Sequence, residues 1–281
     1  MVVDSHHHFW DPSRRDYPWM GDELAAIRQR FGPEEFAPLL ATAGVDRTIV
    51  VQTISSLDET REFLATANVT DFISGVVGWV DLTAPSVGET LAELRAVVGG
   101  NLLVGIRHQV HDEPDPRWLL RDDVRRGIAA VGEAGLVYDL LVKARELPAA
   151  VALVKEFPSM TFVLDHIGKP RIATGPRDEE WEKAMAPLAR CPNVYCKLSG
   201  MVTEADWTNW SAADLMPYVS RVLDWYGPDR CMFGSDWPVC LLAADYQRVI
   251  DTLELTIEDL NPNARAGVLG QNAERAYGLS T

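Results

Sequence analysis

Short apolar runs alternate with amphipathic helical stretches along the whole chain, and this alternation limits the fold more than any other feature of the sequence. The eight predicted strands are Val2–His8, Arg47–Thr53, Phe72–Val80, Leu102–His108, Leu136–Val142, Met160–His166, Val194–Leu198 and Arg230–Phe233. The predicted helices are Pro33–Ala43, Asp58–Ala67, Ser86–Val97, Asp122–Ala134, Leu147–Phe157, Glu179–Arg190, Asp214–Tyr226, Ala244–Leu255 and Pro262–Tyr277. Apolar strands separated by helices are typical of a parallel sheet that helices cover.

Eight such strand–helix units in 281 residues predict an α/β fold, a (β/α)₈ TIM barrel formed by residues 1–281 as a single domain. A doubly wound open sheet is the alternative. No glycine-rich nucleotide-binding fingerprint follows any predicted strand. Gly99 and Gly100 precede a strand, so they do not form a phosphate-binding loop. These observations favour the closed barrel.

The charge and composition of the chain exclude several classes of function. The formal net charge of −15 makes nucleic acid and anionic membranes unsuitable partners. No apolar run approaches the roughly 20 residues of a membrane span, and no secretory signal pattern precedes the first strand. The four cysteines form no C-x-x-C pair, which indicates reduced thiols and a cytoplasmic protein.

Three consecutive histidines end the first predicted strand. Because alternate side chains of a strand share a face, His6 and His8 point one way and His7 points the other way. Two imidazoles on one face suit a metal site or a proton-transfer site. An expression-tag remnant or a polar strand end is the alternative, but the following Phe9–Pro12 has the character of native chain.

Polar residues recur at the C-terminal ends of the other strands. Together with the histidines of the first strand they are His6, His8, Gln52, Arg107, His108, Asp139, His166, Lys197 and Asp236. The C-terminal ends of barrel strands meet at one mouth, and charged groups are costly to bury unless they are paired. One such residue needs only a strand-end hydrogen bond, whereas the whole set predicts an active site. Two roles stay open for Lys197, which either pairs with Asp139 or binds substrate.

Two connections also bear on the predicted mouth. The loop Trp10–Trp19 is long for a connection, which indicates a role over the site. His111 lies in the loop after the fourth strand, where we expect it to be solvated.

Five segments in order across the chain resemble the amidohydrolase superfamily and, within it, the amidohydrolase-2 group of TIM-barrel lactonases. They are Asp4–Asp11, Gly105–His108, Leu164–Pro170, Lys197–Gly200 and Phe233–Pro238. Gly105–His108, followed by Asp112–Pro116, is similar to the branch of sugar-acid lactonases of the L-fuconolactonase and L-rhamnonolactonase type.

The resemblance implies a catalytic cluster of His6, His8, His166 and Asp236. The sequence departs from the two-metal pattern of the superfamily. Arg107-His108 stands where a bridging lysine or glutamate would sit, and Asp139 stands where a ligand histidine would sit. We therefore expect either one divalent metal, Zn²⁺ first, held by His6, His8 and Asp236, or a metal-independent reaction.

The predicted reaction is the opening of a sugar-acid lactone to the free acid. Asp236 would take the proton from water, and His6, His8 and His166, or a metal that they hold, would polarise the water or the carbonyl. The predicted substrate-binding residues are Arg107, His108, Gln52, Lys197 and Asp139, with Trp10 and Trp237 as apolar walls. Ser235 does not have the spacing of a nucleophile elbow.

Three other readings stay open at this stage. The first is a metal-dependent decarboxylase of the same superfamily, and the second is a non-catalytic sugar-acid binding protein. The third, hydrolysis of an amide or phosphoester, usually requires the two-metal site that the sequence lacks. The partner in the favoured reading is a small sugar lactone; its ring size and configuration, and whether the chain forms a homo-oligomer, are left open.

Overall fold

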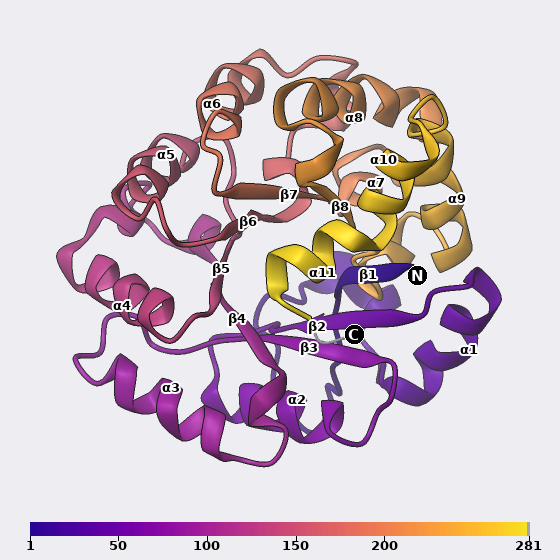
Figure 1. Cartoon of the computed structure of the whole chain (residues 1–281). Coiled ribbons are helices and arrows are strands. Elements are labelled where there is room, and N and C mark those ends of the chain that lie inside the picture. Colours follow the sequence, from indigo (N-terminus) through magenta and orange to yellow (C-terminus); the bar gives the residue numbers. More distant parts are fainter. Residues whose placement is uncertain (280–281) are drawn as a thin grey trace.

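The computed structural model describes residues 1–279, and its centre is one parallel sheet of eight strands in chain order that forms a nearly closed barrel (Figure 1). The strands are β1 (Val3–His7), β2 (Arg47–Val51), β3 (Ile73–Gly78), β4 (Leu103–His108), β5 (Val137–Leu140), β6 (Phe162–Leu164), β7 (Val194–Leu198) and β8 (Cys231–Phe233). The chain after β8 meets β1, since the backbone N–H of Asp236 donates to the carbonyl of His6 at 2.8 Å. The predicted TIM barrel is confirmed.

The helices lie outside the strands, most of them in a ring around the barrel (Figure 1). They are α1 (Pro33–Ala43), α2 (Leu57–Ala67), α3 (Val87–Ala96), α4 (Asp122–Glu133), α5 (Leu147–Glu156), α6 (Glu179–Ala189), α7 (Met201–Glu204), α8 (Ala212–Tyr226), α9 (Tyr246–Thr256), α10 (Pro262–Ala266) and α11 (Asn272–Tyr277). The sequence predicted one helix from Pro262 to Tyr277. The structure instead has a π-helical turn, Gly267–Gln271, between α10 and α11.

Several helix ends follow from local sequence chemistry. Ser56 caps α2, because its side chain accepts a hydrogen bond from the backbone N–H of Glu59. Asp178 caps α6 in the same way. Helix α1 ends at Gly44, whose φ of 68° lies in the left-handed region that glycine adopts without strain.

The barrel interior is apolar at the end where the strands begin. Inward-facing Val3, Ile49 and Val77 pack there with residues of α11, which lies close to the start of β1 (Figure 1). Tyr277 of α11 extends into the barrel, and its hydroxyl lies 2.9 and 2.8 Å from the two carboxylate oxygens of Asp139. The C-terminal helix therefore closes one end of the barrel and leaves the other end for the functional groups.

The cysteines and the helix lengths agree with what the composition predicts. All four cysteines are free and buried. Among the helices of residues 1–279, none combines the length and the apolar character that crossing a membrane requires.

Helix α4 approaches the chain after β3 so closely that only glycine fits at Gly127. A Cβ there would lie 2.2 Å from the carbonyl oxygen of Leu82. We expect Gly127→Ala to lower the free energy of unfolding by about 1–3 kcal/mol, the usual cost of overpacking. Urea unfolding followed by circular dichroism measures this change.

The matched control is Gly88→Ala in α3, where a Cβ would meet no atom within 4 Å. Alanine is the better helix former there, so stability should stay equal or rise by up to about 1 kcal/mol. Equal stability of both variants would contradict the close contact between α4 and Leu82.

Candidate active site

The end of β1 gives two imidazoles to the barrel interior. His6 and His8 lie on the inner face, as the alternation of the strand predicts. His7 points outward, where its Nε2 lies 2.9 Å from Thr48 Oγ1 and its ring packs against Phe36. His6 and His8 therefore belong to the candidate site, and His7 belongs to the outer core.

Two further members of the site are held in an unusual backbone conformation. His166, just after β6, has a φ of 53°, and Asp236, just after β8, has a φ of 58°. Residues other than glycine rarely adopt this left-handed region, and such strain concentrates at functional sites. Gly200 allows His166 to take this position, since a Cβ on Gly200 would lie 2.5 Å from His166 Nδ1.

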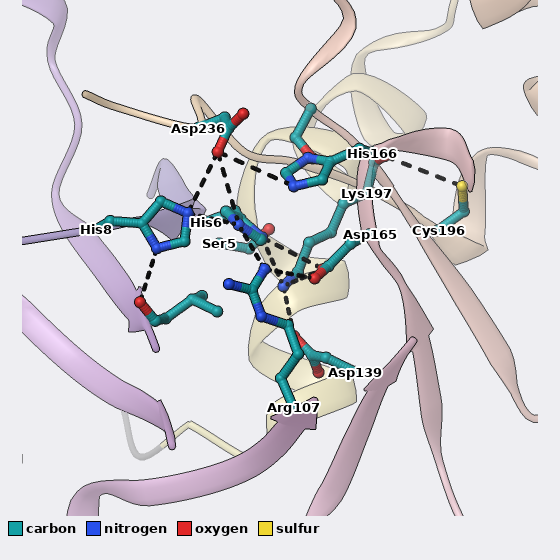
Figure 2. A network of polar contacts seen from close by, with 12 residues as sticks. Ser5, His6, His8, Arg107, Asp139, Asp165, His166, Cys196, Lys197 and Asp236 are labelled. Carbon is teal, nitrogen blue, oxygen red and sulfur yellow. Dashed lines mark hydrogen bonds and ion pairs between the residues drawn. The ribbon is translucent and has the colours of Figure 1, made fainter. Parts of the chain in front are cut away.

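The side chains of His6, His8, His166 and Asp236 converge on one point (Figure 2). Nε2 of His8 lies 3.2 Å from Nε2 of His6 and 3.3 Å from Oδ1 of Asp236. The same carboxylate oxygen lies 3.8 Å from Nε2 of His6 and 4.0 Å from Nε2 of His166. All four side chains are almost completely buried.

The proton states of these groups follow from their neighbours. Nδ1 of His8 lies 2.7 Å from the carbonyl oxygen of Val51, which can only accept, so Nδ1 carries the proton and Nε2 presents a lone pair. Burial lowers the pKa of His166 to about 4 and that of His6 well below its usual value. Both imidazoles are therefore neutral at pH 7.

Asp236 is ionised in this setting. Burial alone would raise its pKa, but the interactions with the surrounding imidazoles of His166, His8 and His6 outweigh burial and hold the pKa of Asp236 below its usual value. The centre of the cluster thus contains a carboxylate and at least one imidazole lone pair that face each other. Such groups repel unless a cation or a proton lies between them.

The donor set fits one divalent metal ion. In a tetrahedral zinc site with bonds of about 2.0–2.1 Å, neighbouring donors lie roughly 3.3 Å apart. Donor atoms of His6, His166 and Asp236 all lie within 4.8 Å of one another, and His8 lies 3.2–3.3 Å from two of these residues. His166 therefore belongs to the candidate donor set, although the sequence predicted only His6, His8 and Asp236 as ligands.

A second layer of charge lies on the other side of His6 (Figure 2). The ammonium of Lys197 is 2.6 Å from Asp139 Oδ2, 2.9 Å from Asp165 Oδ1 and 3.2 Å from His6 Nδ1. Arg107 Nη1 is 3.0 Å from Asp165 Oδ2 and 3.3 Å from His6 Nε2. Of the two roles left open for Lys197, the structure has the ion pair with Asp139.

Asp165 is a functional residue that the sequence reasoning missed. Burial opposes its ionisation, but Lys197, His6 and Arg107 together hold the pKa of Asp165 well below its usual value. Strand alternation would place Asp165 and His166 on opposite faces. The strand ends at Leu164, however, and the turn that follows directs both side chains inward. The available signal was a carboxylate directly after a fully apolar strand.

Gln52 supports Arg107. Its side-chain oxygen accepts a hydrogen bond of 2.9 Å from Arg107 Nε, and its backbone carbonyl accepts another from Arg107 Nη2. Its amide nitrogen donates to Gln109 at 3.0 Å. Gln52 thus holds the guanidinium from behind, whereas Arg107 itself lines the cavity above the cluster.

That cavity has a volume of about 310 Å³, and His8, Arg107, His166 and Asp236 form part of its wall. Loop residues that complete it are Trp19, Thr53, Gln109, His111, Asp112, Leu141, Lys169 and Val239. The long loop after β1 therefore contributes to the site through Trp19, as its length predicted. His111 was expected to be solvated, but its side chain is only 17% exposed.

Of the residues predicted to bind substrate, Arg107 lines this cavity, whereas Gln52, Lys197 and Asp139 lie behind it and Trp237, Trp10 and His108 lie elsewhere. The ring of Trp237 stacks on Phe36 at 4.3 Å, and Trp10 Nε1 donates to the carbonyl of Ile27 at 3.0 Å. The two rings lie in the buried aromatic core and not among the residues that line this cavity. His108 stacks on Trp118 at 4.3 Å, because the alternation of β4 that turns Arg107 inward turns His108 outward.

A larger groove of about 730 Å³ lies beside α1 and α2, where Phe9, Trp10 and Phe63 form part of its lining. None of the four cluster residues lines it. The chemistry therefore belongs to the smaller cavity.

The chain belongs to the amidohydrolase family. The amidohydrolase family model (Amidohydro_2) matches residues 3–279. An L-fucono-1,5-lactonase of Burkholderia multivorans is 40% identical over 287 residues, which covers 99% of this chain and 96% of the relative. The L-rhamnono-gamma-lactonase of Scheffersomyces stipitis is 24% identical and covers 64% of this chain and 60% of the relative.

Crystal structures of an amidohydrolase from Burkholderia multivorans superimpose on the whole chain. One, with bound HEPES, has a TM-score of 0.93 and 40% identity, and both chains are covered completely. Another, with bound zinc, has a TM-score of 0.93 and 38% identity, again over both complete chains.

The ion pairs of Lys197 generate a prediction about stability. In Lys197→Met the carboxylates of Asp139 and Asp165 would stay buried without their ammonium partner. Removing one partner of a buried ion pair typically costs about 3–5 kcal/mol, and we expect a loss of that size in the free energy of unfolding. Urea unfolding of the purified variant measures it.

Lys169→Met is the matched control, because the pair of Lys169 with Glu204 is partly exposed and should contribute less than about 1 kcal/mol. A Lys197→Met variant as stable as this control would show that the buried pairs do not stabilise the barrel.

Proposed function

We propose that this protein hydrolyses the ring ester of a sugar-acid lactone to the free acid. The observation that carries the proposal is the ionised carboxylate of Asp236, placed among buried imidazoles at a cavity of about 310 Å³. A lactone needs a base for the attacking water and a positive group near its carbonyl. The lactonase names of the relatives at 40% identity support the same reaction.

Asp236 is the proposed general base. Its carboxylate takes a proton from water, and the resulting hydroxide forms a bond to the lactone carbonyl carbon. The ring C–O bond of the tetrahedral intermediate then breaks, and the proton held by Asp236 passes to the departing alkoxide. The product is a hydroxy acid that releases one proton at neutral pH, which makes turnover measurable as acid.

Arg107 is the proposed stabiliser of the oxyanion. A guanidinium has five N–H groups, and those of Arg107 that bond Gln52 and Asp165 do not use all of them. Since Arg107 also lines the cavity, a remaining N–H can donate to the carbonyl oxygen as negative charge develops there. His6 and His166 would orient the water beside Asp236.

We further propose that His6, His8, His166 and Asp236 hold one zinc ion. Zinc bound there would act as a Lewis acid and lower the pKa of the water. The ligand distances support the proposal, as does the zinc-bound structure of the relative.

The charges around the cavity favour a neutral substrate over an aromatic or unsaturated acid. Arg107 is bonded to Asp165, and Lys169 is paired with Glu204, so both cations of the lining already have carboxylate partners. The lining also includes the carboxylates of Asp112 and Asp236, which repel an anion. These charges favour lactone hydrolysis over the decarboxylase and binding-protein alternatives.

The first test measures acid release from a panel of aldonolactones with a pH indicator. We expect wild-type protein to hydrolyse at least one of them. Asp236→Asn should lower kcat by about 10²–10⁴-fold because the amide cannot accept the proton. Asp251→Asn, on the exposed face of α9, is the control and should keep full activity. Carbon dioxide release from aromatic acids, without lactone hydrolysis, would instead support the decarboxylase.

The second test concerns the metal. After dialysis against a chelator and then against zinc, wild-type protein should retain one zinc ion per chain by plasma mass spectrometry. His8→Ala and Asp236→Asn should retain much less, because each loses a proposed ligand. A protein that binds no zinc and hydrolyses lactones equally well with and without the chelator would establish the metal-independent reaction.

A further inference from the structure

Two polar atoms of cavity-lining residues have no partner within the protein. Among the residues that the structure describes, Trp19 Nε1 and His111 Nδ1 are buried and make no hydrogen bond, and both side chains line the active-site cavity. Buried polar groups are nearly always hydrogen-bonded, and an unmade bond is costly. Two such atoms, both on residues that line one cavity, indicate that a ligand supplies the missing partners.

The two atoms have complementary chemistry. An indole N–H can only donate. Burial, with the nearby ammonium groups of Lys169 and Lys143, lowers the pKa of His111 to about 3, so the imidazole is neutral. Nε2 of His111 lies 3.6 Å from Asp112 Oδ1, which favours the proton on Nε2 and leaves Nδ1 as an acceptor. The pair therefore offers one donor and one acceptor without net charge.

Trp19 is supported through its side chain and His111 through its backbone. Trp19 packs edge-to-face against the buried ring of Trp10 at 5.4 Å. The backbone N–H of His111 donates to the carbonyl of Leu141 at 3.3 Å, and Arg145 donates to the carbonyl of His111. The two residues follow β1 and β4, and β2 and β3 lie between these strands in the barrel. They therefore approach the cavity from separate parts of its rim.

We propose that Trp19 and His111 recognise hydroxyl groups of the lactone ring. The indole N–H of Trp19 donates to one hydroxyl oxygen, and Nδ1 of His111 accepts a hydrogen bond from an O–H group. A hydroxyl both donates and accepts, so a polyhydroxylated ring satisfies both atoms, whereas a carboxylate offers nothing to Nδ1. This inference rests on the proposed lactone substrate and makes it specific: the protein selects polyhydroxylated lactones over unsubstituted rings of the same size.

The test compares kcat/KM for an aldono-1,5-lactone with kcat/KM for δ-valerolactone, which has the same ring without hydroxyls. The ratio of these values should fall about tenfold in Trp19→Phe, which removes the N–H donor and keeps an aromatic ring, and about tenfold in His111→Leu. His111→Asn returns a polar group near the Nδ1 position and should recover part of the ratio. Trp225→Phe, on the outer helix α8, is the matched control and should keep the wild-type ratio.

A ratio that stays within about twofold of wild type in both variants would overturn the inference, because the side chains would then only shape the cavity. A binding measurement keeps the inference separate from the reaction. Calorimetry with a 1,5-anhydroalditol, a ring polyol without a carbonyl, should show binding to wild-type protein that weakens about tenfold in each variant. If no lactone is hydrolysed but this pattern holds, hydroxyl recognition stands and the proposed reaction is wrong; equal binding by all forms overturns the recognition.

Discussion

The structure depends on the ion pairs of a lysine buried in the middle of the barrel. Lys197 lies between Asp139 and Asp165, and all three side chains are inaccessible to solvent. Charges buried in this way are tolerated only when they are paired and hydrogen-bonded, so each partner fixes the next. Asp139 bonds Tyr277 on one side, which connects the charges to the helix that closes the barrel. Asp165 contacts His6 on the other side, which connects them to the active site.

This arrangement explains why the imidazoles can take part in chemistry at neutral pH. Burial keeps His6 and His166 neutral, while Lys197 and Arg107 keep Asp165 ionised and the surrounding imidazoles lower the pKa of Asp236. A neutral histidine retains the lone pair that a metal ion or a proton in transfer requires. The strained backbone of His166 and Asp236 is maintained because the barrel holds both residues from several sides.

Much of the fold and part of the site could be predicted from the sequence, because strand alternation decides which side chains point inward. It placed His6 and His8 on the inner face correctly. It fails where a strand ends early. Asp165 was missed because the chain leaves β6 at Leu164, and Trp237 was expected at the substrate although the chain after β8 turns it into the outer aromatic core. The inner or outer direction of a side chain beyond a strand end is set by tertiary packing, which a periodic pattern does not contain.

The strands of the barrel and the loops that follow them contribute differently to substrate specificity. In the proposed reaction the strands provide the charges that act on an ester carbonyl, and these charges are largely satisfied by one another: Arg107 by Asp165, and Lys197 by Asp139 and Asp165. Selection among esters must then come from groups that are not already paired, and these lie in the loops after the strands. Trp19 and His111 are such groups, and both are uncharged. A site that uses its charges internally and presents neutral donors and acceptors to the ligand is suited to a neutral polyol ring, since each hydroxyl supplies the hydrogen-bond partner that the protein atom lacks.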